Sequence, residues 1–211
     1  MIINDCFLDQ HNSIITGETT LGQKIRSAGK RHLWDERAGG AFDTVVIHYI
    51  SAVNKGVKNR FGFGAVMSVF CEYGVSSHFL INRRGKVFGL VPVEKKAWHC
   101  GGSIMPAPDR RTGVNDFSVG IELLATHDSG YTGAQYRALT ALCGCLESAA
   151  GKKMNYLGHS DVAGEEAVRM GLRKEVKTDP GPLFDWGAFN LEMGRQRSDS
   201  TAGKMVRKRM V

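Results

Sequence analysis

The chain has 211 residues, of which 42% are hydrophobic and 23% are charged, and its formal net charge is +7 at pH 7. These values are typical of one soluble globular domain. No apolar run approaches the length of a transmembrane helix, which excludes a membrane-spanning protein. The positive charge favours a polyanionic partner, such as nucleic acid, an anionic membrane surface or a bacterial wall polymer. Part of that charge is local, because Lys204, Arg207, Lys208 and Arg209 lie together near the C-terminus.

The five cysteines are scattered and odd in number, which does not match a disulfide framework. Reduced thiols favour a reducing compartment. The first residues lack the basic and apolar regions of a signal peptide. We therefore expect a cytoplasmic protein; the alternative is a protein released by cell lysis.

Composition divides the chain into three parts. Residues 1–40 are polar and glycine-rich, and we expect an N-terminal extension of irregular structure with one short helix. Residues 41–193 contain the periodic segments and form the predicted domain. Residues 194–211 carry few apolar and many basic side chains, which predicts a disordered tail.

Short apolar runs predict the strands of this domain. The runs are residues 44–49, 77–81, 86–91 and 156–159. The first contains His48 near its end and the last ends at His159. Gly85 lies in the loop between the second and third runs, which predicts a β-hairpin.

Residues 117–123 alternate between apolar and polar or small side chains, as in a strand with two distinct faces. The apolar face predicts core packing. Ser118, Gly120 and Glu122 share the other face. Its small residues lead to a single carboxylate, and we expect room for a ligand above this part of the sheet.

Helical patterns alternate with these strands, joined by long loops. The first expected helix runs from near Ala65 to near Tyr73. The second starts at the Thr132–Gln135 capping-box pattern and ends near Gly151, and the third runs from Phe184 to near Met193. Long connections cover residues 94–112 and 160–176. Loops of this length inside compact domains often carry functional residues.

A carboxylate near the C-terminal end of the domain completes a candidate metal site. Lys177 and Asp179 are two residues apart, and Pro180 favours an extended conformation at Asp179, so both side chains can face one pocket. Together with His48 and His159, Asp179 makes the two-imidazole, one-carboxylate set of a catalytic zinc site with an open fourth position. The alternative for each histidine is a purely structural role, and for the Lys/Asp pair a solvated turn.

Two further residues suit hydrolysis at such a site. Zinc lowers the pKa of bound water from 15.7 to about 7, and Glu122 is a candidate general base for that water. Lys177 is a candidate for stabilising the oxyanion of a tetrahedral intermediate. The alternatives are a carboxylate paired with a surface cation for Glu122 and a solvated ammonium group for Lys177.

The segment around Trp98 and His99 is a candidate substrate contact. His99 lies in a glycine-flanked loop and suits either a substrate contact or a hydrogen bond to a metal ligand; a structural histidine is the alternative. Trp98 suits stacking on a sugar face, with buried packing as its alternative. His78 lies inside a predicted strand and is interpreted as structural.

Seven segments, in order, resemble the zinc-dependent N-acetylmuramoyl-L-alanine amidases, the family that includes the anhydro-muropeptide amidases, phage T7 lysozyme and the peptidoglycan recognition proteins. The matching segments are residues 45–48, 75–81, 96–99, 115–123, 131–136, 158–163 and 177–182. The resemblance covers about residues 42–190. Residues 1–40 and the basic tail have no counterpart, and the loop at 163–176 looks longer and more charged than is usual in the family.

The resemblance implies an α/β single-domain fold: a central mixed β-sheet flanked by helices, with a zinc groove on one face. It implies one catalytic Zn²⁺ held by His48, His159 and Asp179, with Glu122 and Lys177 as the catalytic pair. The implied reaction is hydrolysis of the amide between N-acetylmuramic acid and the L-alanine of the stem peptide. The closest similarity is to the branch that recycles wall fragments in the cytoplasm, which favours the 1,6-anhydro form of the sugar.

Three other functions compete with this interpretation. A phage-type endolysin would act on intact peptidoglycan, and the basic tail would suit adhesion to an anionic wall. A non-catalytic peptidoglycan-binding protein would lack a metal ligand or the catalytic pair, and all five residues are present. A nucleic-acid-binding protein would show a basic stripe studded with aromatic residues, which the sequence lacks. We therefore expect a muropeptide or peptidoglycan substrate, no nucleic-acid partner and no membrane span; the oligomeric state is left open.

Overall fold

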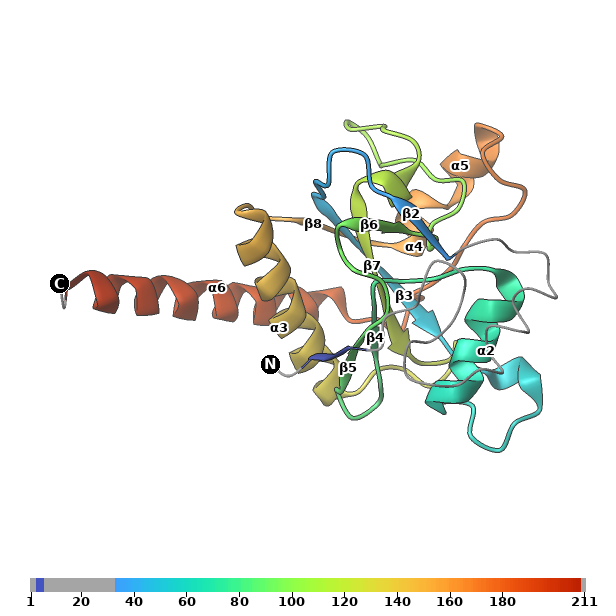
Figure 1. The fold of residues 1–211 in the computed structure, drawn as a ribbon, viewed down its shortest axis with the longest axis horizontal. Coiled ribbons are helices and arrows are strands. Elements are labelled where there is room, and N and C mark those ends of the chain that lie inside the picture. Colours follow the sequence, from blue (N-terminus) through green and yellow to red (C-terminus); the bar gives the residue numbers. More distant parts are fainter. Residues whose placement is uncertain (1–2, 6–32, 210–211) are drawn as a thin grey trace.

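The computed structural model describes residues 3–5 and 33–209, and within them a six-stranded mixed sheet has helices on both faces (Figure 1). The sheet order is β1 (Ile3–Asp5), β5 (Val87–Gly89), β4 (Phe79–Ile81), β7 (Ser118–Leu124), β3 (Thr44–Ile50) and β8 (Asn155–Gly158). Only β4 and β5 pair antiparallel among these six; their neighbours pair parallel. The predicted central mixed sheet flanked by helices is confirmed, as is the β4–β5 hairpin.

The central strands β3 and β7 position the two faces of the sheet. They pair in parallel with Ile47 opposite Ile121 and His48 opposite Glu122. Every residue of β7 is buried, as expected for a parallel strand covered on both sides. The alternation of β7 then sends Ile121 into one face and Glu122 into the other.

One face of the sheet packs against α3 (Gly133–Ala150) and the first turns of α6 (Trp186–Arg209). This core contains Val45, Ile47, Val119, Ile121, Leu123, Leu139, Leu142, Phe184 and Phe189. The predicted capping box opens α3: the Gln135 backbone N–H donates to Thr132 Oγ1 and the Thr132 N–H donates to Gln135 Oε1, each at 3.1 Å. The apolar face of β7 is therefore the core face that the sequence predicts.

The opposite face is covered at its two ends and open between them. At one end α2 (Phe63–Tyr73) packs on Leu80 and Leu124. At the other end Val46 packs against Cys100, Val114 and residues of α4 (His159–Val162). His48 and Glu122 lie between these two clusters on the same face, because each is two residues from a cluster member along its strand.

Part of the segment expected to be an N-terminal extension pairs with the domain. Strand β2 (Trp34–Glu36) pairs antiparallel with β6 (Lys95–Ala97). The buried Arg37 guanidinium donates to the carbonyl oxygens of Lys95 and Ser118, both at 2.8 Å. These pairings are long-range, so the local composition does not reveal them. Residues 6–32, and any short helix expected there, lie outside the described residues.

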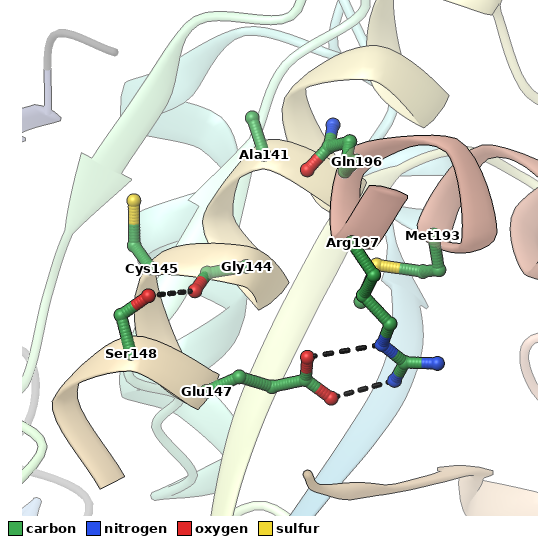
Figure 2. A pocket seen from close by; sticks show the side chains of 8 residues that line it. All are labelled: Ala141, Gly144, Cys145, Glu147, Ser148, Met193, Gln196 and Arg197. Carbon is green, nitrogen blue, oxygen red and sulfur yellow. Dashed lines mark hydrogen bonds and ion pairs between the residues drawn. The ribbon is translucent and has the colours of Figure 1, made fainter. Parts of the chain in front are cut away.

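Helix α6 differs from the expected closing helix, which was predicted to end near Met193. It continues to Arg209, through the segment predicted to be a disordered tail, and projects past α3 in Figure 1. Arg197 forms an ion pair with Glu147 of α3, with 2.6 Å between Nη2 and Oε1. Figure 2 shows this pair lining a pocket between α3 and α6. The packed first turns provide a nucleus from which the polar remainder of the helix extends.

No helix in the described part of the chain is both long enough and apolar enough to cross a membrane.

Candidate active site

The side chains of His48, His159 and Asp179 meet where two neighbouring parallel strands end. His48 lies near the end of β3, and His159 begins α4 directly after β8. The Asp179 carboxylate lies between them: Oδ2 is 3.1 Å from His48 Nδ1, and Oδ1 is 3.1 Å from His159 Nδ1. One ligand atom from each residue lies within 4.8 Å of the others. The structure thus brings together the three residues expected to bind metal.

The three side chains have the chemistry that zinc requires of its ligands. Two neutral imidazoles and one ionised carboxylate suit a catalytic zinc site. Burial, and then the charge of His159, lower the pKa of His48 to about 4, which keeps this imidazole neutral. Burial opposes ionisation of Asp179, but hydrogen bonds with His159 and His48 hold its pKa well below the usual range. The three residues fit zinc.

Glu122 lies beside this set on the same face of the sheet. Its side chain is buried, and Oε2 has no hydrogen-bond partner among the described residues. Burial, followed by the charge of Asp179, raises the pKa of Glu122 well above its usual value, while the charge of Lys177 acts in the opposite direction. A buried carboxylate oxygen without a partner has a high free-energy cost, so this atom is suited to a bound water or cation.

Lys177 faces the same pocket, which has a volume of about 400 Å³. The residues lining it are His48, Tyr49, Ile50, Val75, His99, Glu122, His159, Val176, Lys177, Thr178 and Asp179. The Lys177 backbone N–H donates to the Ala163 carbonyl oxygen at 3.0 Å, which ties this loop to the end of α4. Sequence reasoning had not singled out Tyr49, Val75 or Val176.

The loop that follows α4 forms part of the pocket wall. It contains α5 (Glu165–Arg169) and continues to Val176, which lines the pocket. The backbone packs tightly against residues 100–102, because a Cβ built on Gly102 would lie only 1.9 Å from the Leu172 carbonyl oxygen. The segment expected to be a longer, charged loop is therefore packed against residues 100–102 and reaches the pocket at Val176.

His99 and Trp98 lie in different environments. His99 is buried, lines the pocket and places Nδ1 3.1 Å from His48 Nε2. Trp98 is half-buried, and Lys96 Nζ lies 5.1 Å from its ring centroid. Among the described residues, Trp98 is not one of those that line this pocket. The structure brings His99, but not Trp98, to the candidate ligands.

The His99 ring packs directly on Gly120. A Cβ built on Gly120 would lie 2.5 Å from His99 Cγ, closer than real contacts allow. The glycine therefore makes room for an imidazole of the protein itself. The space for a ligand on this face of the sheet lies beside Glu122, which lines the pocket.

His78 forms a hydrogen bond with the backbone of strand β7. The Gly120 N–H donates to His78 Nδ1 at 2.9 Å, so the ring proton lies on Nε2, which donates to the Lys95 carbonyl oxygen at 3.0 Å. Burial, and then the charge of Arg37, lower the pKa of His78 to about 3. These contacts agree with the structural role predicted for His78.

We expect Gly120→Ala to destabilise the protein by about 1–3 kcal/mol, because the added methyl group overpacks the His99 ring. Chemical denaturation of the metal-free protein measures this loss. Gly64→Ala in α2 is the matched control, since a Cβ there meets nothing within 4 Å. Equal stability of the two variants would contradict the close packing of His99 on Gly120.

The fold and site define an α/β protein with a two-histidine, one-aspartate pocket on one face of a mixed sheet. The family model for N-acetylmuramoyl-L-alanine amidase matches residues 38–182. The chain belongs to the N-acetylmuramoyl-L-alanine amidase family.

Individual relatives agree with this assignment. The chain is 40% identical over 126 residues to the 1,6-anhydro-N-acetylmuramyl-L-alanine amidase AmpD of Escherichia coli (strain K12); the match covers 58% of this chain and 60% of the relative. A crystal structure of a selenomethionine AmpD derivative superposes with a TM-score of 0.61 at 34% identity, covering 75% of this chain and 89% of that one. The amidase AmiD from E. coli, solved with anhydro-N-acetylmuramic acid-L-Ala-D-γ-Glu-L-Lys, gives a TM-score of 0.56 at 27% identity, covering 72% and 57%.

Proposed function

We propose that the protein is a zinc-dependent amidase that hydrolyses the bond between N-acetylmuramic acid and the L-alanine of a stem peptide. The observation that carries this proposal is the convergence of His48, His159 and Asp179 beside the buried carboxylate of Glu122 in one pocket. The family supports the bond, since its members are N-acetylmuramoyl-L-alanine amidases. The alternative of a non-catalytic binding protein is disfavoured, because Glu122 and Lys177 both face the pocket.

In this proposal His48, His159 and Asp179 hold a single zinc ion, which when bound polarises the scissile carbonyl and lowers the pKa of a water to about 7. Glu122 accepts a proton from that water at Oε2, the oxygen without a partner, and then donates it to the leaving amine. Burial keeps the proton on Glu122 between these two events, because it disfavours the charged carboxylate.

Lys177 and His99 have supporting roles. The exposed Lys177 ammonium group reaches into the pocket from a loop whose backbone is fixed, and it stabilises the oxyanion that develops on the carbonyl oxygen. Of the two roles considered for His99, the buried contact with His48 favours orientation of a metal ligand over contact with substrate. Trp98 has no support as a sugar-stacking residue, since it lies outside the described pocket lining.

The substrate in this proposal is a soluble muropeptide with a 1,6-anhydro sugar, and the role is peptidoglycan recycling in the cytoplasm. The 40%-identical relative is named a 1,6-anhydro-N-acetylmuramyl-L-alanine amidase, and the structure of AmiD was solved with an anhydro-muropeptide. The second candidate is an endolysin that acts on intact wall; the basic C-terminal part of α6 suits an anionic polymer.

Mass-spectrometric analysis of two digests tests the proposal. The purified protein is incubated with an anhydro-muropeptide and with intact peptidoglycan, each with and without a zinc chelator. We expect release of free stem peptide from the muropeptide, abolished by the chelator and restored by added zinc. Preferential release from intact wall would instead support the endolysin. No release from either substrate by the zinc-loaded protein would overturn the amidase proposal.

A further inference from the structure

The side chain of Asn115 holds the backbone of His99, which lines the pocket, and of Cys100. Asn115 lies in a short 3₁₀ helix, Val114–Asp116, and its side chain is buried. Its Oδ1 accepts hydrogen bonds from two successive backbone N–H groups, those of His99 at 3.2 Å and Cys100 at 2.9 Å. Arg37 donates to the Asn115 carbonyl oxygen at 3.2 Å, so the backbone of this asparagine is anchored as well.

The dipeptide of His99 and Cys100 in turn contacts both candidate imidazole ligands. The Cys100 carbonyl oxygen is 3.2 Å from His159 Nε2. The His99 ring places Nδ1 3.1 Å from His48 Nε2, and its own Nε2 is 3.3 Å from Ser118 Oγ. One dipeptide thus reaches the Nε2 atoms of both rings whose Nδ1 atoms face Asp179.

These contacts suit the tautomer that each ligand needs when it binds a metal. When His159 Nδ1 binds the metal, the ring proton lies on Nε2, and the Cys100 carbonyl oxygen can accept a hydrogen bond from it. His48 Nε2 likewise donates to His99 Nδ1 when the His99 proton lies on Nε2, toward Ser118 Oγ. Both rings then present an unprotonated Nδ1 to the same point, as a metal ligand must.

We infer that Asn115 is a positioning residue for the metal centre: through the dipeptide of His99 and Cys100 it orients both histidine ligands. This inference rests on the proposed zinc site. Loss of the Asn115 acceptor leaves two buried N–H groups unpaired, so the dipeptide shifts, and its carbonyl and imidazole partners shift with it.

The test compares zinc affinity among three variants, measured by competition with a chelator of known affinity. We expect Asn115→Leu to bind zinc about 10–100-fold more weakly, the usual effect of removing a group that orients a metal ligand. Asn115→Asp keeps an oxygen acceptor at the same position and is expected to restore affinity to within a few-fold of wild type. Asn82→Leu is the matched control: Asn82 Oδ1 also accepts from two backbone N–H groups, those of Arg84 and Lys86, but in the β4–β5 turn.

A second readout separates positioning from general stability. In the zinc-loaded protein, NMR should show that the Nε2–H protons of His48 and His159 exchange slowly with solvent, because both rings are buried and both Nε2 atoms have hydrogen-bond partners. Asn115→Leu should lose this protection, whereas Asn82→Leu should keep it even though its melting temperature falls.

Equal zinc affinities for Asn115→Leu and Asn82→Leu, with zinc bound by the wild type, would overturn the inference and leave the proposed function intact. If Asn115→Leu does not fold, the wild type decides, and fast exchange of these Nε2–H protons in its zinc-loaded form would overturn the inference. Failure of the wild type itself to bind zinc would instead refute the proposed function.

Discussion

His159→Ala and Asp179→Ala are expected to remove zinc from the purified protein and to abolish amide hydrolysis. The Asp179 carboxylate contacts both imidazoles, so each substitution breaks a three-residue donor set and leaves two ligands. Without the metal the attacking water returns from a pKa of about 7 to 15.7, and we expect the rate at neutral pH to fall by more than about 10⁴-fold. Metal analysis and the muropeptide digest measure the two effects on the same preparations.

The control for these variants is His127→Ala, which removes an exposed imidazole after β7. It should keep both zinc and activity. Circular dichroism establishes that the ligand variants remain folded, which we expect because the core on the α3 and α6 face is untouched. Full hydrolysis by either ligand variant would refute the assignment of that residue.

Glu122→Gln is expected to separate metal binding from chemistry. Glutamine has the size of glutamate but cannot accept a proton, so the variant should bind zinc normally and lose about 10²–10⁴-fold in kcat. The substitution should not destabilise the fold, because the buried Oε2 has no hydrogen-bond partner to lose among the described residues. Single-turnover kinetics with an anhydro-muropeptide and metal analysis together measure the outcome.

Glu147→Gln is the matched control for this substitution. Glu147 is a partly buried carboxylate paired with Arg197 in the pocket between α3 and α6, on the opposite face of the sheet (Figure 2). Its replacement should affect stability but not kcat. If zinc content falls in parallel with activity in Glu122→Gln, then Glu122 is a metal ligand or structural residue and the general-base role is wrong.

The proposed chemistry depends on a separation of roles between the two faces of the sheet. The face toward α3 and α6 supplies a continuous apolar core. The other face has two smaller clusters with the titratable residues between them. Low polarity around the buried His48 and Glu122 strengthens each electrostatic interaction in the pocket, while the exposed Lys177 keeps one side accessible to a substrate.

Local patterns were sufficient for much of the fold. The alternation in residues 117–123 identified the two faces of β7, the Thr132–Gln135 pattern located the start of α3, and Gly85 marked the hairpin turn. Each of these signals acts over a few residues, because hydrophobic periodicity and capping depend on neighbouring positions. The candidate ligands were also visible, since histidines near the ends of two parallel strands meet at one edge of a sheet.

Contacts between distant segments were decided only by the tertiary structure. The pairing of β2 with β6, the packing of His99 on Gly120 and the anchoring of residues 99–100 by Asn115 have no local pattern. His48 and Asp179 are 131 positions apart, and only the assembled sheet brings them to 3.1 Å. By itself the sequence determined which residue types the site contains and which strands carry them. Their order around the site, and the side chains that orient them, depend on long-range packing, which local periodicity does not encode.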